Sequence, residues 1–154
     1  MAKSLFHAKA YLQEGVQVKA KSRHFEVTID EPKELGGTDT GMNPVELTLS
    51  ALGACQAIVA RMFAKKFGIE FDDFWVELTG ELDTDGFLHK ADDVRPGFQW
   101  IRYNIHIKTD APREKVEEFV TFIEKTCPVG DTIAHSTKTE LNDIVIEKVG
   151  EPIL

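Results

Sequence analysis

Cysteine, basic charge and long apolar runs are all scarce in this chain of 154 residues. Two cysteines are present, and 18 lysines and arginines stand against 26 aspartates and glutamates, for a net charge of −8. Because phosphate binding needs a basic surface, we expect no nucleic-acid partner. No run of 18 apolar residues exists, and the N-terminal stretch MAKSLFHAKAYLQEG lacks an apolar signal region. We therefore expect neither a membrane span nor export.

Without an export signal, the expected location is the reducing cytoplasm. Two cysteines there are more typical of reactive or buried thiols than of a structural disulfide. The five histidines show no i, i+4 pairing and no Cys-x-x-Cys partner, so a zinc site is weakly indicated and no metal or cofactor is expected. The glycine-rich stretch 30–43 lacks the Gly-Lys-Ser/Thr ending of a phosphate-binding loop.

Hydrophobic patterning predicts one α+β domain over residues 1–154. Apolar residues make up 42% of the chain, which is ordinary globular composition. The expected strands are residues 5–11, 16–20, 24–29, 74–83, 98–108 and about Asp143–Glu147, and the expected helices are residues 44–67 and 110–125. Residues 30–43 and the charged stretch 84–97 are expected to be loops. Strands and helices in this order are typical of α+β folds rather than of βαβ units.

The first predicted helix is apolar nearly all the way round. Asn43 and Pro44 suit its N-cap and first position, and Gly68 suits its end. Its apolar residues are not confined to one stripe, so the helix should be buried on most sides. Because the predicted strands can cover only part of it, we expect a second subunit to cover the rest.

Cys127 precedes Pro128, and the sequence PVGDTIA can start a short helical turn. Cys127 would then be an N-cap, where exposed amides and the positive helix end stabilise a thiolate. The segment is equally compatible with a cysteine that only fills a turn.

Cys55 lies 11 residues past Pro44, or about 16 Å along the helix. The effect of the helix end fades within the first turn, so it cannot activate Cys55. A buried cysteine in apolar surroundings is usually inert core. Reactivity at Cys55 would need a cation or a hydrogen-bond donor from elsewhere in the fold.

Two charged residues are candidates for that role, and each has a simpler interpretation. Glu46 lies in the first turn of the helix, where an anion is stabilised by the positive helix end. Arg23 lies at a strand edge and is most simply a surface charge.

Three segments carry a resemblance to a known family: DEPKELGGTDTGMNPVELTLSALGACQA (30–57), RPGFQWI (95–101) and TCPVGDTI (126–133). An Asn-Pro-x-Glu-Leu pattern precedes a cysteine in a helix of small residues, and the second cysteine lies in Cys-Pro-Val. The chain resembles, over nearly its whole length, the OsmC/Ohr family of thiol-dependent peroxidases.

The resemblance implies an intertwined homodimer, with long central helices wrapped by antiparallel sheets. It implies that Cys55 attacks the peroxide and becomes a sulfenic acid, and that Cys127 resolves it to a disulfide. An external dithiol or a lipoyl-type reductant would then reduce the disulfide, with no bound cofactor. The implied substrates are organic hydroperoxides, with hydrogen peroxide reduced less well, in defence against oxidative stress.

In the best-known branch of the family an arginine and a glutamate activate the first cysteine. Arg23 is the nearest match to the arginine. The glutamate lies ten residues before the cysteine in that branch, where this chain has Val45, whereas Glu46 lies nine before. The chain thus resembles a less characterised branch. Two alternatives stay open: a dimer that binds an apolar ligand or senses redox state, and a metal site built from Cys55, Cys127 and a histidine.

Overall fold

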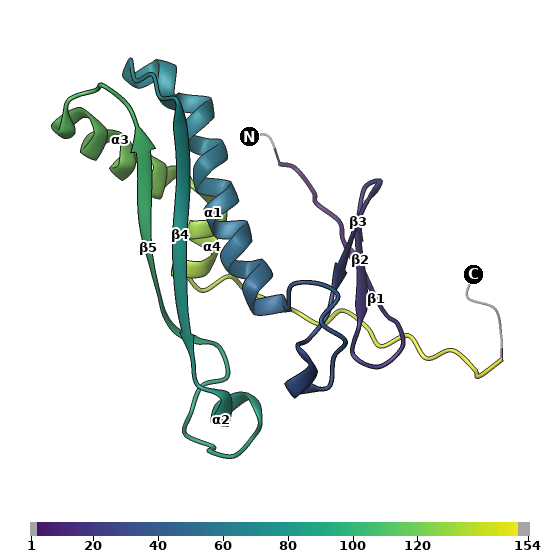
Figure 1. Ribbon diagram of the computed structural model, residues 1–154. Helices are drawn as coiled ribbons and strands as arrows, with labels where there is room; N and C mark the ends of the chain where they lie inside the picture. The colour runs from purple at the N-terminus through teal and green to yellow at the C-terminus, as the bar shows by residue number, and fades with distance from the viewer. Residues whose placement is uncertain (1–2, 151–154) are drawn as a thin grey trace.

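The computed structural model describes residues 3–150 and has two parts, an N-terminal sheet and a helix–hairpin body (Figure 1). The N-terminal sheet is an antiparallel meander of β1 (Lys9–Leu12), β2 (Val18–Ser22) and β3 (Phe25–Ile29). The helix–hairpin body contains the remaining helices and strands. The α+β class with antiparallel sheets and a central helix is confirmed, and the three first strands lie within a few residues of their predicted positions.

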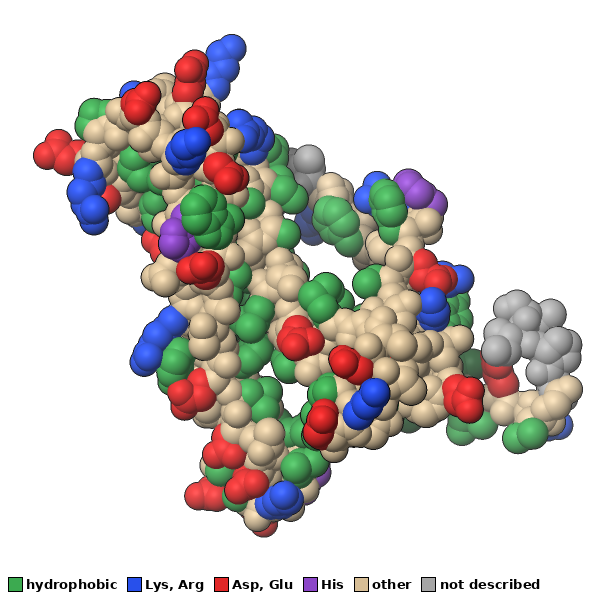
Figure 2. Space-filling view, in the orientation of Figure 1, with side chains coloured by type: hydrophobic (Ala, Val, Ile, Leu, Met, Phe, Trp, Pro, Cys, Tyr) green, Lys and Arg blue, Asp and Glu red, His purple; other side chains and the backbone are tan. Residues whose placement is uncertain are grey.

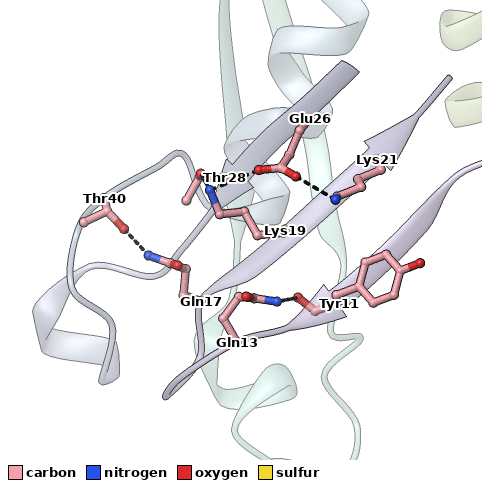
Figure 3. A network of polar contacts seen from close by, with 8 residues as sticks. All are labelled: Tyr11, Gln13, Gln17, Lys19, Lys21, Glu26, Thr28 and Thr40. Carbon is pink, nitrogen blue, oxygen red and sulfur yellow. Dashed lines mark hydrogen bonds and ion pairs between the residues drawn. The ribbon is translucent and has the colours of Figure 1, made fainter. Parts of the chain in front are cut away.

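Ion pairs and hydrogen bonds between side chains cross the N-terminal sheet (Figure 3). Glu26 pairs with Lys19 at 3.2 Å and with Lys21 at 3.0 Å. The Gln17 amide donates to the Thr40 hydroxyl at 2.8 Å, which ties the following loop to the sheet. Such exposed pairs stabilise little on their own. That loop, predicted for residues 30–43, contains only the short 3-10 turn Lys33–Leu35.

The central helix α1 spans Pro44–Phe63 and continues as a 3-10 turn over Ala64–Phe67. Asn43 caps it, Pro44 is its first residue, and Gly68 ends the turn with φ of 57°. Glycine suits this position because a side chain strains a left-handed backbone. The predicted helix over residues 44–67 is therefore confirmed at both ends.

The body is built around α1. β4 (Asp73–Leu82) and β5 (Phe98–Lys108) form an antiparallel hairpin whose inner face packs on α1, and α3 (Arg113–Thr126) and α4 (Pro128–Ala134) also contact α1. Gly53 lets the hairpin approach closely, because a Cβ at this position would lie 2.8 Å from Leu78 Cδ1. The core cluster consists of Val59, Ala60, Ala64, Ile69, Phe119 and Ile123.

Two predicted features differ from the structure. The stretch 84–97 is mostly loop, but it begins with the short helix α2 (Thr84–Phe87). The strand predicted at about Asp143–Glu147 is wrong: these residues have no regular structure, and Ile144, Val145 and Ile146 are exposed. A strand needs a neighbour for its backbone hydrogen bonds, and within residues 3–150 no strand runs beside this segment.

The chain by itself covers only part of α1. Ile58 and Met62 on this helix are 60% and 68% exposed, so the predicted burial on most sides is not reached within one chain. By length and composition alone, the helical run Pro44–Phe67, with a mean hydropathy of 1.5, could cross a membrane. The core helix of a soluble protein can have the same length and composition. In this structure the helix contacts β4, α3 and α4.

Candidate functional site

The structure brings the two cysteines together from distant parts of the sequence. Cys55 lies in the middle of α1 and packs against the core cluster, while Cys127 lies at the junction of α3 and α4 and is fully buried. Both are free thiols. The two side chains lie close enough for Cys55 to raise the pKa of Cys127, so the cysteines are neighbours in the fold.

Cys127 is both the C-cap of α3 and the N-cap of α4. Its N–H donates to the carbonyl of Ile123 at 3.0 Å, and its Sγ accepts from the N–H of Gly130 at 3.2 Å. The predicted N-cap is confirmed. Burial, followed by the hydrogen bond to Cys55, raises the pKa of the Cys127 thiol, whereas the Gly130 N–H lowers it. Burial outweighs the helix end, so the expected stabilisation of a thiolate does not prevail.

The two cysteines differ in their exposure. Cys127 is fully buried, whereas Cys55 is partly exposed. Cys55 is therefore the member of the pair that a molecule from solvent can reach.

The surroundings of Cys55 are apolar. Leu52 lies one turn before it on α1 and Val59 one turn after it, both buried. Phe119 and Ile123 of α3 are fully buried in the same cluster. The partly exposed Cys55 therefore lies at the edge of the apolar core.

Three residues that the sequence reasoning missed form a polar chain beside the cysteines. The Tyr103 hydroxyl of β5 donates to Glu124 Oε1 of α3 at 2.7 Å. Burial, followed by this bond, raises the pKa of Tyr103 to about 12, while a hydrogen bond from Gln56 of α1 lowers it. The Cys127 thiolate also raises the pKa of Tyr103, so the two groups lie within electrostatic range.

Among these three polar residues, Gln56 is the least expected. Its side chain is 1% exposed, and its Oε1 has no hydrogen-bond partner. Leaving such an acceptor unpaired costs about 1–3 kcal/mol, which an apolar side chain would avoid. A polar residue at a core position of an apolar helix, next to a cysteine, is the sequence signal that could have identified it.

The two candidate activating residues are placed elsewhere. Glu46 forms a capping box with Asn43: the Asn43 N–H donates to Glu46 Oε2 and the Glu46 N–H donates to Asn43 Oδ1, each at 2.9 Å. This confirms the simpler interpretation of Glu46 as an anion at the helix start.

Arg23 lies in the turn between β2 and β3, at φ of 56°, and its guanidinium lies 4.8 Å from the centre of the Phe25 ring. That turn stands away from α1 (Figure 1). The single chain therefore does not bring Arg23 to Cys55. As for metals, the part of the chain that the structure describes has no group of three or more His, Cys, Asp or Glu side chains that could hold an ion.

The fold and the site define a dithiol protein: an antiparallel α+β scaffold that holds two neighbouring thiols at an apolar core, Cys127 buried and Cys55 partly buried. The family model described as OsmC-like protein matches residues 37–142, so the chain belongs to the OsmC family. The chain is also similar to the hydroperoxide reductases of Mycoplasma pneumoniae and Mycoplasma genitalium, at 28% and 26% identity over 137 residues. Each match covers 86% of this chain and 89% of the relative.

Solved structures agree with this assignment. The OsmC-like protein from Mycoplasma pneumoniae superposes with a TM-score of 0.77 at 26% identity, over 88% of this chain and 91% of that one. An organic hydroperoxide resistance protein OsmC from Legionella pneumophila has a TM-score of 0.61 at 21% identity, over 86% and 91% of the two chains. The second likeness concerns the fold alone.

Proposed function

We propose that this protein is a thiol-dependent peroxidase that reduces organic hydroperoxides. The observation that carries the proposal is the closeness of two free thiols, Cys127 fully buried and Cys55 partly exposed against an apolar core. Their different exposure suits a first, attacking cysteine and a second, resolving one. The names of the two mycoplasma relatives, hydroperoxide reductases, support the same reaction class.

The reaction has three balanced steps. The Cys55 thiolate attacks the terminal peroxide oxygen, the O–O bond breaks, and the alkoxide takes up a proton and leaves as an alcohol. Cys55 is then a sulfenic acid. The Cys127 sulfur attacks it, forming the disulfide and releasing the sulfenic oxygen as water with the Cys127 proton. An external dithiol, of which a lipoyl group is one form, then exchanges with the disulfide and restores both thiols.

The apolar lining suits organic hydroperoxides better than hydrogen peroxide. Cys55 packs against apolar side chains, so we expect a hydrocarbon portion, which hydrogen peroxide lacks, to be favoured beside it. The proposed setting is the reducing cytoplasm, because each turnover ends with two free thiols and needs a supply of dithiol.

The proposed working form is a homodimer. The accessible surface of one chain is 12577 Å², whereas a compact monomer of this mass exposes on the order of 7,800 Å². Figure 2 shows hydrophobic side chains around the openings between the two parts of the chain. A second copy packed there would cover Ile58 and Met62, give residues 143–147 a neighbouring strand, and offer Arg23 a route to the other copy's Cys55.

The peroxidase proposal is tested by consumption of cumene hydroperoxide with a dithiol. Wild type should consume it, Cys55→Ser should not, and Cys127→Ser should accumulate a sulfenic acid at Cys55 that a sulfenic-acid-specific probe labels. Equal background consumption by all three proteins would overturn the proposal. If all three proteins show only this background and wild type binds an apolar ligand saturably, the alternative of a binding or redox-sensing dimer is favoured.

Sedimentation tests the dimer. We expect twice the chain mass at micromolar concentration and a Tm that rises with protein concentration. Ile58→Glu should weaken the association at least about tenfold, since it places a charge in an apolar contact. Thr121→Glu adds the same charge to an exposed position of α3 and is the control. A monomeric mass for wild type would refute the dimer.

A further inference from the structure

A single loop, residues 30–43, connects the N-terminal sheet to the helix–hairpin body. Strands β1, β2 and β3 pair with one another, whereas α1 packs against β4, α3 and α4. Figure 1 shows the sheet standing apart from α1. Where the sheet lies relative to α1 within one chain therefore depends on the conformation of this loop.

Donors from both halves of the loop converge on the carboxylate of Asp30, a residue that is 1% exposed. Its Oδ2 accepts from the hydroxyl of Thr38 at 2.6 Å and from that of Thr40 at 2.8 Å. The backbone N–H groups of the same two threonines donate to Oδ2 at 3.1 and 3.2 Å, and the N–H of Glu31 donates to Oδ1 at 2.9 Å. Hydrogen bonds to a charged acceptor are stronger than neutral ones, so this carboxylate holds the loop closed.

The loop is tied to the N-terminal sheet. Asp30 directly follows β3, and the hydroxyl of Thr40, which donates to Asp30, also accepts from the Gln17 amide at 2.8 Å (Figure 3). Gly41 lies so close to the end of β3 that a Cβ on it would overlap the carbonyl oxygen of Thr28. The second half of the loop is therefore packed back onto the sheet from which the loop starts.

The same loop is bonded to the start of α1. The Asp30 N–H donates to the Met42 carbonyl at 3.3 Å, and Asn43, which caps α1, donates through Nδ2 to Glu31 Oε2 at 3.4 Å. A flexible chain of this length would separate its ends by roughly 20 Å on average. In the structure, the first residue after the sheet contacts the residue next to the N-cap, so the loop is a closed link between the two parts.

Gly37 shows how little room the closed loop leaves. A Cβ at this position would overlap the carbonyl oxygen of Glu31, and the N–H of Asp39 donates to that same oxygen at 3.2 Å. The N–H of Gly37 itself donates to the carbonyl of Pro32 at 3.2 Å. Because backbone packs on backbone here, the loop cannot change shape without breaking these hydrogen bonds.

We propose that residues 30–43 are a rigid joint and that Asp30 is the positioning residue that holds it, so that the N-terminal sheet keeps one orientation relative to α1 in the single chain. Its purpose rests on the proposed dimer, because a preorganised sheet loses less conformational entropy when a second copy binds. The joint also presents the β2–β3 turn, which contains Arg23, in one place. The rigidity itself is a property of one chain and is measured without hydroperoxide.

Three variants separate the joint from the rest of the fold. Asp30→Asn keeps the size of the side chain but removes its charge and replaces one of its two accepting oxygens by a donating NH2 group. Thr38→Val removes one hydroxyl donor and is the milder second variant. Asp39→Asn removes the same charge from an exposed position of the same loop and is the control.

The test is pulsed EPR between two spin labels in one chain, at Glu14 in the turn between β1 and β2 and at Glu118 on α3, both exposed. Labels on unnatural amino acids leave the cysteines untouched. The Ile58→Glu background, diluted with unlabelled protein, is used so that a second copy does not hold the sheet. We expect a narrow distance distribution in this background and one at least about twice as broad after Asp30→Asn, because the loop then approaches a flexible chain.

Dimer affinity is the second readout, measured by sedimentation without the Ile58→Glu change. Asp30→Asn should raise the dissociation constant of the dimer at least about tenfold, since the sheet must then be ordered on binding. Thr38→Val should fall between Asp30→Asn and wild type in both readouts, and Asp39→Asn should match wild type. A purely structural role of Asp30 would lower Tm without broadening the distance distribution.

An equally narrow distribution in folded Asp30→Asn and Thr38→Val would overturn the joint, and so would a broad distribution before either change. Broadening with an unchanged dissociation constant would overturn its role in association. A monomeric wild type refutes the dimer, and the EPR measurement then still decides on the joint. Hydroperoxide consumption is measured separately, so a wild type that consumes none refutes the peroxidase proposal and leaves the joint intact.

Discussion

The sulfur of Cys127 accepts a hydrogen bond from the backbone N–H of Gly130 at 3.2 Å, and Cys127 is thereby the N-cap of α4. The same residue ends α3. Gly130 lies close against it, since a Cβ on Gly130 would be 3.5 Å from Cys127 Sγ and 3.6 Å from Leu52 Cδ1. The proposed resolving cysteine is thus part of the connection between two helices, so its structural and chemical contributions must be measured apart.

Replacing Cys127 by serine and by alanine separates these contributions. Both variants abolish the proposed disulfide, but serine keeps an acceptor for the Gly130 N–H and alanine does not. We expect Cys127→Ala to be less stable than Cys127→Ser by about 0.5–2 kcal/mol, the usual contribution of an N-cap. Urea unfolding of the reduced proteins measures the difference. Equal stability would show that the sulfur does not cap α4 in solution.

Glu46 allows the same separation of structure from activation. Glu46→Ala removes the capping box with Asn43 and should cost about 0.5–2 kcal/mol. Glu46→Gln keeps a side chain that can accept from the Asn43 N–H, so it should cost less. Alkylation of Cys55 should be unchanged in both variants, because Glu46 is committed to the helix start. Slower alkylation in Glu46→Gln would instead make it an activating residue.

Arg23 is held in a conformation that costs free energy. A non-glycine residue at φ of 56° is strained by roughly 1 kcal/mol, and glycine would adopt this turn freely. We expect Arg23→Gly to stabilise the protein by about 0.5–1 kcal/mol in thermal or urea unfolding. If Arg23 of one copy activates Cys55 of the other in the proposed dimer, the same change should slow Cys55 alkylation several-fold.

Arg23→Lys provides the comparison for that prediction. Lysine keeps the positive charge and the strained backbone, so it should leave stability unchanged and preserve more of the Cys55 reactivity than glycine does. If the glycine variant has normal Cys55 reactivity, Arg23 does not activate Cys55, and its role is limited to the contact with Phe25.

The sequence predicted the local features well, because short-range physical rules determine them. Asn43 and Pro44 set the start of α1, Gly68 set its end, and Cys127 with Pro128 set the start of α4. The last strand failed because a strand depends on a neighbour that lies far away in the sequence or in another chain. Local periodicity carries no information about that neighbour.

The site was predictable in part for the same reason. The spacing placed Cys55 in the middle of α1, and the structure confirms that position. What activates Cys55 stays a prediction, and the closeness of Cys127 to it could not be read from the sequence. The chain of Gln56, Tyr103 and Glu124 was missed because its members come from three elements, and only the folded structure shows that they meet.

Asp30 organises the loop before α1 and gives the fold an acid-sensitive element. Its buried carboxylate accepts from the hydroxyl and N–H groups of Thr38 and Thr40 and from the N–H of Glu31. The Thr38 hydrogen bond is the largest of the effects that lower its pKa, against the opposing effect of burial. The charged form is therefore the one that holds the loop.

The sign of the pH dependence follows from that lowered pKa. Stabilisation by Asp30 is fully present above the unfolded-chain value of about 3.9 and is lost as the pH falls through the lower folded-state pKa. Asp30→Asn should therefore lower Tm at pH 7, and its deficit against wild type should shrink below about pH 4. Asp39→Asn, at an exposed position of the same loop, should show no such deficit. Thermal unfolding between about pH 2 and pH 7 checks this; a deficit that stays constant over the range would mean that the Asp30 charge does not hold the loop.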